Sequence, residues 1–203
     1  DRNIVLLTNA TAAVIKQELA RICKLVSLKG SAGELVFYYA GHGFTDENSK
    51  EPYLIPVDVT AGNLTSAIKL YDLYQQLSAT GAGKITVFMD ACFSGGGRDA
   101  GLMAARGIKV VPKKESLTGN LVVFSATQED QVALPYREKQ HGMFTYFLLK
   151  KLQETNASCS YSDLFNYIKD SVSEYSLREN RKVQIPEVNT SNAVHPTWEQ
   201  WGF

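Results

Sequence analysis

The chain has 203 residues, 44% of them hydrophobic, and its 21 basic and 21 acidic residues cancel to a net charge of zero. This length and composition suit one globular domain with a full core. The balanced charge argues against a protein that coats nucleic acid or lies on a membrane surface, and no apolar run approaches the roughly 20 residues of a membrane span. We therefore expect neither nucleic acid nor membrane as a partner.

The first half of the chain alternates apolar runs of strand length with helical periodicity. The elements it predicts are a strand over 3–7, a helix over 11–28 capped from Thr8, Asn9 or Thr11, a strand over 35–40, a strand over 53–57 and a helix over 70–77. The run 35–40 is apolar throughout, which is typical of a parallel strand buried on both faces. It ends in Gly41-His42-Gly43, and a polar loop follows over 45–51.

The second half continues the alternation. Its predicted elements are a strand over 84–89, a long basic loop over 98–116, a strand over 121–124, a helix over 144–152, a helix that starts after Ser160 and runs to about Tyr175, and a short strand over 184–188. Ser160 and Asp163 form a capping-box-like pair, and Pro186 places the last strand at a sheet edge. Buried strands alternating with amphipathic helices specify an α/β domain with a mostly parallel sheet.

Two reactive side chains come directly after buried strands of this predicted sheet. His42 follows the strand 35–40, and Cys92 follows the strand 84–89. Reactive groups of parallel sheets gather beyond the carboxyl ends of the strands, so two neighbouring strands would bring both side chains to one edge. A thiol becomes a nucleophile beside a base, which histidine supplies near neutral pH. The N–H groups of Gly43 and Cys92 are candidates for an oxyanion hole.

The other two cysteines have a simpler interpretation. Three cysteines are too few for a disulfide framework, so three free thiols are expected. Cys23, on a predicted helix, and Cys159 are interpreted as small core residues. The sequence does not fix the cellular compartment.

The segments around His42 and Cys92 resemble the two catalytic motifs of the caspase-like cysteine peptidases (clan CD, family C14). These segments are Tyr38-Tyr-Ala-Gly-His-Gly-Phe44 and Phe88-Met-Asp-Ala-Cys-Phe-Ser-Gly95, and His42 precedes Cys92 by 50 residues, the spacing of caspases. The resemblance is closer to the metacaspase and bacterial caspase-homologue branch. Residues 123–127, 141–149 and 183–188 are similar to segments of the family's small subunit.

The resemblance implies a caspase-like three-layer α/β/α sandwich in one domain over 1–203. Within it, 1–97 would match the large subunit, 98–116 a basic loop between subunits, and 117–203 the small subunit. It also implies a cysteine endopeptidase with a dyad, His42 as acid–base and Cys92 as nucleophile. Caspase-like domains begin with a further strand, which this sequence does not supply. Because a sheet without it would expose unpaired edges, we expect a complementing N-terminal fragment as a partner.

The residues around the nucleophile predict a basic substrate. Asp90 stands where animal caspases place a glutamine of their substrate pocket, and Ser125 stands near the place of a pocket arginine. With Ala40 and Asp130 they form the predicted pocket. A buried carboxylate is costly without a cationic partner, so we expect cleavage of peptides and proteins after Arg or Lys. Self-processing would then be possible in the basic loop, at Arg98, Arg106, Lys109, Lys113 or Lys114.

No cofactor is expected from the motifs, with calcium as the alternative. Asp99 matches one calcium-site acid of the metacaspases, but the paired acids expected after the histidine motif are not apparent within 46–58. Two other functions remain open. One is a catalytically silent caspase-like module that binds partners, and the other is a separase-like Cys–His peptidase. A nucleotide-binding enzyme is disfavoured because no glycine-rich phosphate loop follows a strand.

Overall fold

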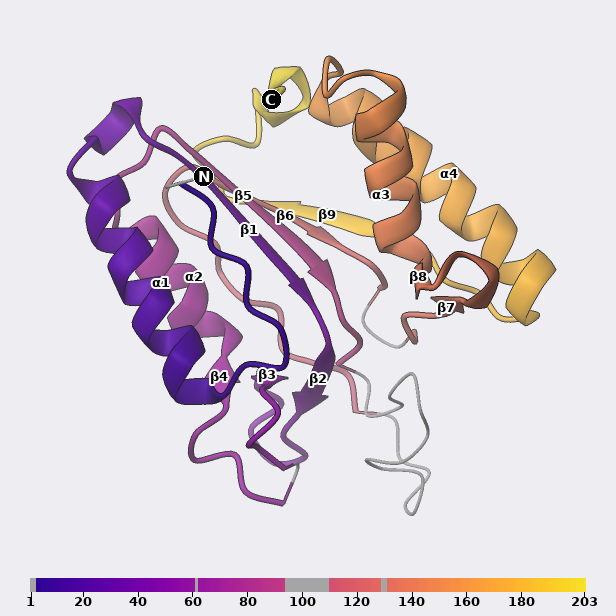
Figure 1. Ribbon diagram of the computed structural model, residues 1–203, viewed down its shortest axis with the longest axis horizontal. Coiled ribbons are helices and arrows are strands. Elements are labelled where there is room, and N and C mark those ends of the chain that lie inside the picture. The colour runs from indigo at the N-terminus through magenta and orange to yellow at the C-terminus, as the bar shows by residue number, and fades with distance from the viewer. Residues whose placement is uncertain (1–2, 61, 94–109, 129–130) are drawn as a thin grey trace.

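The computed structural model describes residues 3–60, 62–93, 110–128 and 131–203, and it places a four-stranded sheet between two pairs of helices (Figure 1). The strands of this sheet are β1 (Glu34–Ala40), β5 (Lys84–Asp90), β6 (Leu121–Ser125) and β9 (Glu187–Thr190), in the order β1-β5-β6-β9. The first three are parallel and β9 is antiparallel to β6. The prediction of an α/β fold with a mostly parallel sheet is confirmed.

Two helices cover each face of the sheet (Figure 1). The first pair is α1 (Ala12–Ser27) and α2 (Leu70–Ser78), and the second is α3 (Met143–Glu154) and α4 (Tyr161–Asn180). The predicted caps are confirmed for α1 and α4. The Thr11 hydroxyl accepts from the Val14 N–H at 3.4 Å, and the Ser160 hydroxyl accepts from the Asp163 N–H at 3.0 Å. Such caps satisfy first-turn N–H groups that the helix itself leaves without partners.

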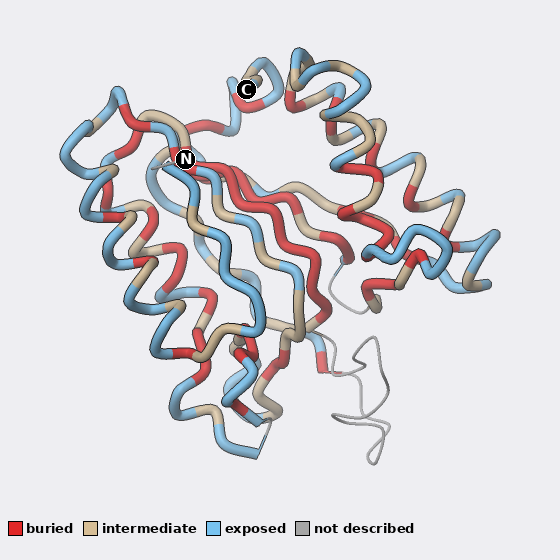
Figure 2. Tube along the Cα trace, in the orientation of Figure 1, coloured by how far each residue is buried: buried red, intermediate tan, exposed pale blue. Residues whose placement is uncertain are grey.

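The hydrophobic core is divided by the sheet. Val87 and Met89 of β5 pack toward α1 and α2, whereas Phe88 of the same strand packs toward α3 and α4. Figure 2 shows β5 and β6 as the most continuously buried strands. Alternate residues of a strand point to opposite faces, so one central strand serves both halves of the core.

Most of the following short elements were not predicted; β3 is the exception, because it overlaps the strand expected over 53–57. A three-stranded antiparallel sheet consists of β2 (His42–Thr45), β3 (Pro52–Ile55) and β4 (Ile68–Lys69), and a hairpin consists of β7 (Pro135–Tyr136) and β8 (His141–Gly142). Three single 3₁₀ turns are η1 (Gly30–Ala32), η2 (Arg137–Lys139) and η3 (Trp198–Gln200). The elements that were missed are only two to four residues long and carry too little periodicity to be distinguished from loops.

The prediction of a strand over 3–7 is wrong for this structure, in which residues 4–7 belong to no strand or helix. Ile4 and Leu6 are 69% and 83% exposed. An apolar run forms a strand only where a neighbouring strand satisfies its backbone groups, and no described strand pairs with this segment.

The prediction that residues 35–40 are buried on both faces is also wrong. β1 is an edge strand, and Val36, Tyr38 and Ala40 are exposed on one face, while Leu35 is buried and Phe37 packs toward α1 and α2. The last strand is at an edge, as predicted, but it starts later than expected. The Gln184 side chain is buried, accepts from the Leu134 N–H at 2.8 Å and donates to the Ala126 carbonyl at 2.9 Å, which draws this residue out of the strand.

Candidate active site

His42 and Cys92 follow two neighbouring strands of the central sheet. Ala40 ends β1 and pairs with Asp90, which ends β5. The Gly41 N–H donates to the Asp90 carbonyl oxygen at 3.3 Å, which extends the pairing one residue beyond β1. Since each residue stands two positions after its strand end, both leave the sheet side by side at one edge, where the reactive groups of parallel sheets are expected.

Gly43 lies against the backbone of the cysteine segment. A Cβ atom on Gly43 would be 2.7 Å from the Cys92 carbonyl oxygen and 2.6 Å from two ring atoms of Phe93. Any larger residue at position 43 would therefore push the two segments apart. The absence of a side chain keeps the histidine and cysteine segments in direct backbone contact.

Tyr39 fixes the turn that carries His42, and sequence reasoning missed this role. Its hydroxyl donates to the His42 carbonyl oxygen at 2.9 Å and lies 3.4 Å from the Ile55 carbonyl oxygen of β3. Burial raises the pKa of Tyr39 to about 12, although the hydrogen bond to Ile55 opposes this rise. A Cβ atom on Gly41 would be 2.7 Å from the same hydroxyl oxygen, so the glycine was the one available signal of a close approach.

Asp90 lies on the same face of the sheet as Cys92. Phe88 and Cys92 both belong to the core under α3 and α4. Asp90 lies midway between them in the sequence, so its side chain points to the same face of the sheet, where it is 0% exposed. Its Oδ2 accepts from the Thr145 N–H at 3.3 Å and from the Thr145 hydroxyl at 2.5 Å. Ala40, opposite it on β1, is exposed. The structure thus brings Asp90 and Ala40 together beside Cys92.

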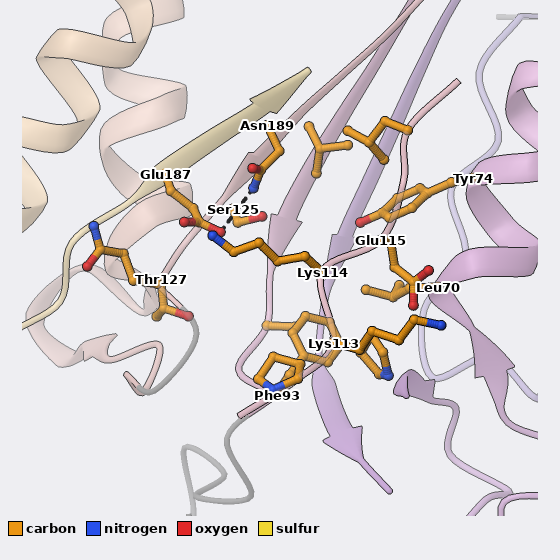
Figure 3. Close-up of a pocket in the computed structure, with 16 residues that line it drawn as sticks. Leu70, Tyr74, Phe93, Lys113, Lys114, Glu115, Ser125, Thr127, Glu187 and Asn189 are labelled. Carbon is orange, nitrogen blue, oxygen red and sulfur yellow. Dashed lines mark hydrogen bonds between the residues drawn. The ribbon is translucent and has the colours of Figure 1, made fainter. Parts of the chain in front are cut away.

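The structure does not bring Ser125 together with Asp90, which corrects the predicted pocket. Ser125 is in register with Met89, whose side chain packs toward α1 and α2. Because successive strand residues alternate between faces, Ser125 lies on the face opposite Asp90. There it lines a cavity of about 100 Å³ with Ala91 and Phe93 (Figure 3).

This cavity also contains polar groups from α2 and from the segment 110–117. Figure 3 shows Tyr74 and Glu115 on one side of it, with Glu187 on the other. Burial raises the pKa of the Glu115 carboxyl and the pKa of the Tyr74 phenol. The Oε1 atom of Glu115 is buried and has no hydrogen-bond partner among the described residues.

The remaining predicted residues fall into two groups. Asp130 and the candidate cleavage sites Arg98, Arg106 and Lys109 lie outside the described residues. Lys113 and Lys114 line the cavity described above. The Lys113 N–H donates to the Lys50 carbonyl oxygen at 2.7 Å, and the Lys113 ammonium lies 3.9 Å from the Glu51 carboxylate, which also pairs with Lys69.

The described ranges contain no group of three or more His, Cys, Asp or Glu side chains that could hold a metal ion. Asp99, the calcium-ligand candidate, lies outside them. In the same ranges, every helix is too short or too polar to cross a bilayer. The three cysteines are free thiols, with Cys23 buried as predicted and Cys159 partly exposed.

Comparisons with known proteins agree with this fold. A profile of the caspase domain (Peptidase_C14) matches residues 3–196. A solved structure of a protein from Geobacter sulfurreducens is similar with a TM-score of 0.64 at 18% identity, over 95% of this chain and 77% of that one. Caspase-1 from Spodoptera frugiperda is similar with a TM-score of 0.61 at 14% identity, over 92% of this chain and 70% of that one.

No curated protein sequence matches the chain. The two solved structures share its fold, and the profile covers nearly its whole length. The chain belongs to the caspase family of cysteine peptidases.

Proposed function

We propose that this chain is a cysteine endopeptidase in which Cys92 is the nucleophile and His42 is its acid–base partner. The observation that carries the proposal is the common exit of both residues from the sheet, directly beyond the paired strand ends Ala40 and Asp90. A thiol needs a nearby base to react as a thiolate, and imidazole is the side chain that can both accept and return a proton near neutral pH.

The reaction needs no group beyond these side chains, two N–H donors and water. His42 takes the thiol proton while the Cys92 sulfur attacks the peptide carbonyl carbon. When the tetrahedral intermediate collapses, the C–N bond breaks and the imidazolium returns the proton to the leaving amine. His42 then takes a proton from water, whose oxygen attacks the thioester. Release of the acid returns the proton to the Cys92 sulfur.

The oxyanion of each tetrahedral intermediate is bound by the N–H groups of Gly43 and Cys92. The contact of Gly43 with the Cys92 carbonyl oxygen and the Phe93 ring supports this role, because it holds the two backbone segments at a fixed separation. Fixed donors stabilise developing charge without reorganisation, and loss of one such donor costs on the order of 10²–10³ in rate.

The preferred substrates carry Arg or Lys before the cleaved bond. Asp90 supports this specificity because it is a buried carboxylate two residues before the nucleophile and on the same sheet face. A charge-assisted hydrogen bond from a guanidinium or ammonium group would be favourable here, whereas an acidic substrate side chain would bring two like charges together.

A peptide library with and without calcium tests this proposal. We expect cleavage of Arg-ending and Lys-ending fluorogenic peptides at kcat/KM values about 100-fold above those of an Asp-ending peptide. Cys92→Ala should abolish cleavage, whereas Cys159→Ala, the matched change at a partly exposed thiol, should retain it. Equal or faster cleavage of the Asp-ending peptide would overturn the specificity, and residual turnover by Cys92→Ala would overturn the nucleophile.

Self-processing is proposed at the basic residues of the loop 98–116, between the parts that match the large and the small subunit. Lys113 and Lys114 lie in a segment held by the Lys50 carbonyl oxygen and the Glu51 carboxylate. Cleavage at either residue therefore requires that this segment first leave its cavity. N-terminal sequencing should locate cuts in the wild-type chain that are missing from Cys92→Ala, and identical fragments from both proteins would refute self-processing.

We also propose that a further extended segment pairs with β1. In the described sheet β1 pairs with β5 alone, and Val36 of β1 is 56% exposed. An open strand edge presents unpaired backbone groups that favour strand addition. Native mass spectrometry of the active enzyme should detect a complementing fragment, whereas full activity of the lone monomeric chain would contradict this partner.

A further inference from the structure

The first turn of α3 faces the buried carboxylate of Asp90. Gly142 is the N-cap of this helix and supplies no side-chain cap. The N–H of Thr145, three residues later, instead donates to Asp90 Oδ2 on the neighbouring strand β5 at 3.3 Å. The Asp90 carboxyl therefore lies at the positive end of the α3 dipole.

The hydroxyl of Thr145 makes a second and shorter bond to the same oxygen, at 2.5 Å. The Tyr38 hydroxyl lies 2.7 Å from Thr145 Oγ1. Because the Thr145 hydroxyl donates its only proton to Asp90, Thr145 Oγ1 accepts the Tyr38 proton. The three groups therefore form a directed chain from Tyr38 through Thr145 to Asp90.

This series of hydrogen bonds connects the protein surface with the fully buried carboxyl group of Asp90. Tyr38 is 46% exposed, Thr145 is 6% exposed and Asp90 is 0% exposed. Tyr38 and Ala40 are exposed on the face of β1 that Asp90 and Cys92 share on β5. The side chain of Ala40 is small, so a substrate side chain that approaches Asp90 past Ala40 would meet the two hydroxyl groups first.

We infer that Thr145 is a positioning residue for substrate specificity: its hydroxyl, oriented by Tyr38, holds the Asp90 carboxylate in the place where it receives a basic substrate side chain. This inference rests on the proposed cleavage after Arg or Lys. The two donors fix one carboxylate oxygen, and a fixed acceptor loses less entropy when a guanidinium or ammonium group binds. Thr145 acts through Asp90 and has no contact with the reacting atoms.

The test compares Thr145→Val, Thr145→Ser and Tyr38→Phe with the wild-type chain on Arg-ending and Lys-ending peptides. Thr145→Val keeps the shape but removes the hydroxyl, and we expect it to raise KM at least about tenfold with kcat within about threefold of wild type. Thr145→Ser retains the donor and should restore KM to near the wild-type value. Tyr38→Phe should raise KM about threefold, because Thr145 then loses its orienting donor.

A purely structural role for Thr145 predicts a different result. A residue that only supported α3 would lower the folded fraction and hence the apparent kcat, and KM would stay unchanged. An unchanged KM in Thr145→Val would therefore overturn the inference. If Thr145→Val fails to fold, Tyr38→Phe decides, since it changes an exposed side chain, and an unchanged KM in this variant would overturn the inference. Absence of Arg or Lys cleavage by the wild-type chain would instead refute the proposed function, and the inference with it.

Discussion

Gly43 lies so close to Cys92 that a Cβ atom at position 43 would be 2.7 Å from the Cys92 carbonyl oxygen. The histidine segment, which lies in β2, and the cysteine segment, which follows β5, are thus in direct backbone contact. This contact depends on one missing side chain, and it makes the candidate site sensitive to the smallest possible substitution.

Gly43→Ala should lower kcat at least about 100-fold, the typical cost of displacing one oxyanion-hole donor. The added methyl group would have to move the Cys92 carbonyl or the Phe93 ring. Gly62→Ala is the matched control, because nothing lies within 4 Å of a Cβ atom at that position. Steady-state peptide cleavage would measure both, and a Gly43→Ala enzyme within threefold of wild type would show that the contact is not needed.

Tyr39→Phe should destabilise the fold by about 1 kcal/mol and lower kcat, because the His42 carbonyl oxygen would lose a buried donor. Urea unfolding and peptide cleavage would measure the two effects. Tyr71→Phe, a change at an exposed tyrosine of α2, is the control and should alter neither. Full activity in Tyr39→Phe would mean that the turn at His42 is held by other contacts.

Much of the fold could be predicted because the strongest signals are local. Thr11 and Ser160 mark helix starts, and the apolar residues of α1 and α4 recur at helical spacing. The common edge for His42 and Cys92 could be predicted as well, since parallel strands carry their carboxyl ends to one side.

The errors concern properties that depend on distant partners. The apolar run of β1 has the composition of a central strand, although the sheet leaves its Val36 and Tyr38 exposed. The face that Ser125 occupies depends on its register with Met89, which composition does not encode. The hydroxyl groups of Thr145 and Tyr38 reach Asp90 only through tertiary structure, since Asp90 and Thr145 are 55 residues apart.

Glu115→Gln should flatten the pH dependence of stability. Burial raises the pKa of the Glu115 carboxyl in the folded state above its ordinary value of 4.5. The folded chain then holds this proton more tightly than the unfolded chain, so stability falls as pH rises from about 4.5 through the raised pKa. Glutamine removes this slope. Urea unfolding between pH 4 and pH 8 would measure it, and parallel curves for wild type and variant would contradict the assignment.

Thr45→Val should stabilise the fold by about 1 kcal/mol. Thr45 is 1% exposed, and its hydroxyl oxygen is buried with no hydrogen-bond partner among the described residues. Valine has the same shape and does not bury a polar atom, so the desolvation cost disappears. Thr65→Val at an exposed position is the control. A lower unfolding midpoint in Thr45→Val would indicate that the hydroxyl is satisfied in solution.

The proton shared between His42 and Cys92 can be tested by alkylation of Cys92 with iodoacetamide, followed by mass spectrometry across pH 5 to 9. In a background of Cys23→Ala and Cys159→Ala, we expect His42→Ala to slow alkylation at pH 6 at least about tenfold, because the imidazole no longer stabilises the thiolate. The two rates should approach each other as the pH rises toward 9, where more of the thiol ionises without the help of the imidazole. Equal rates at pH 6 with and without His42 would contradict the pairing of these two side chains.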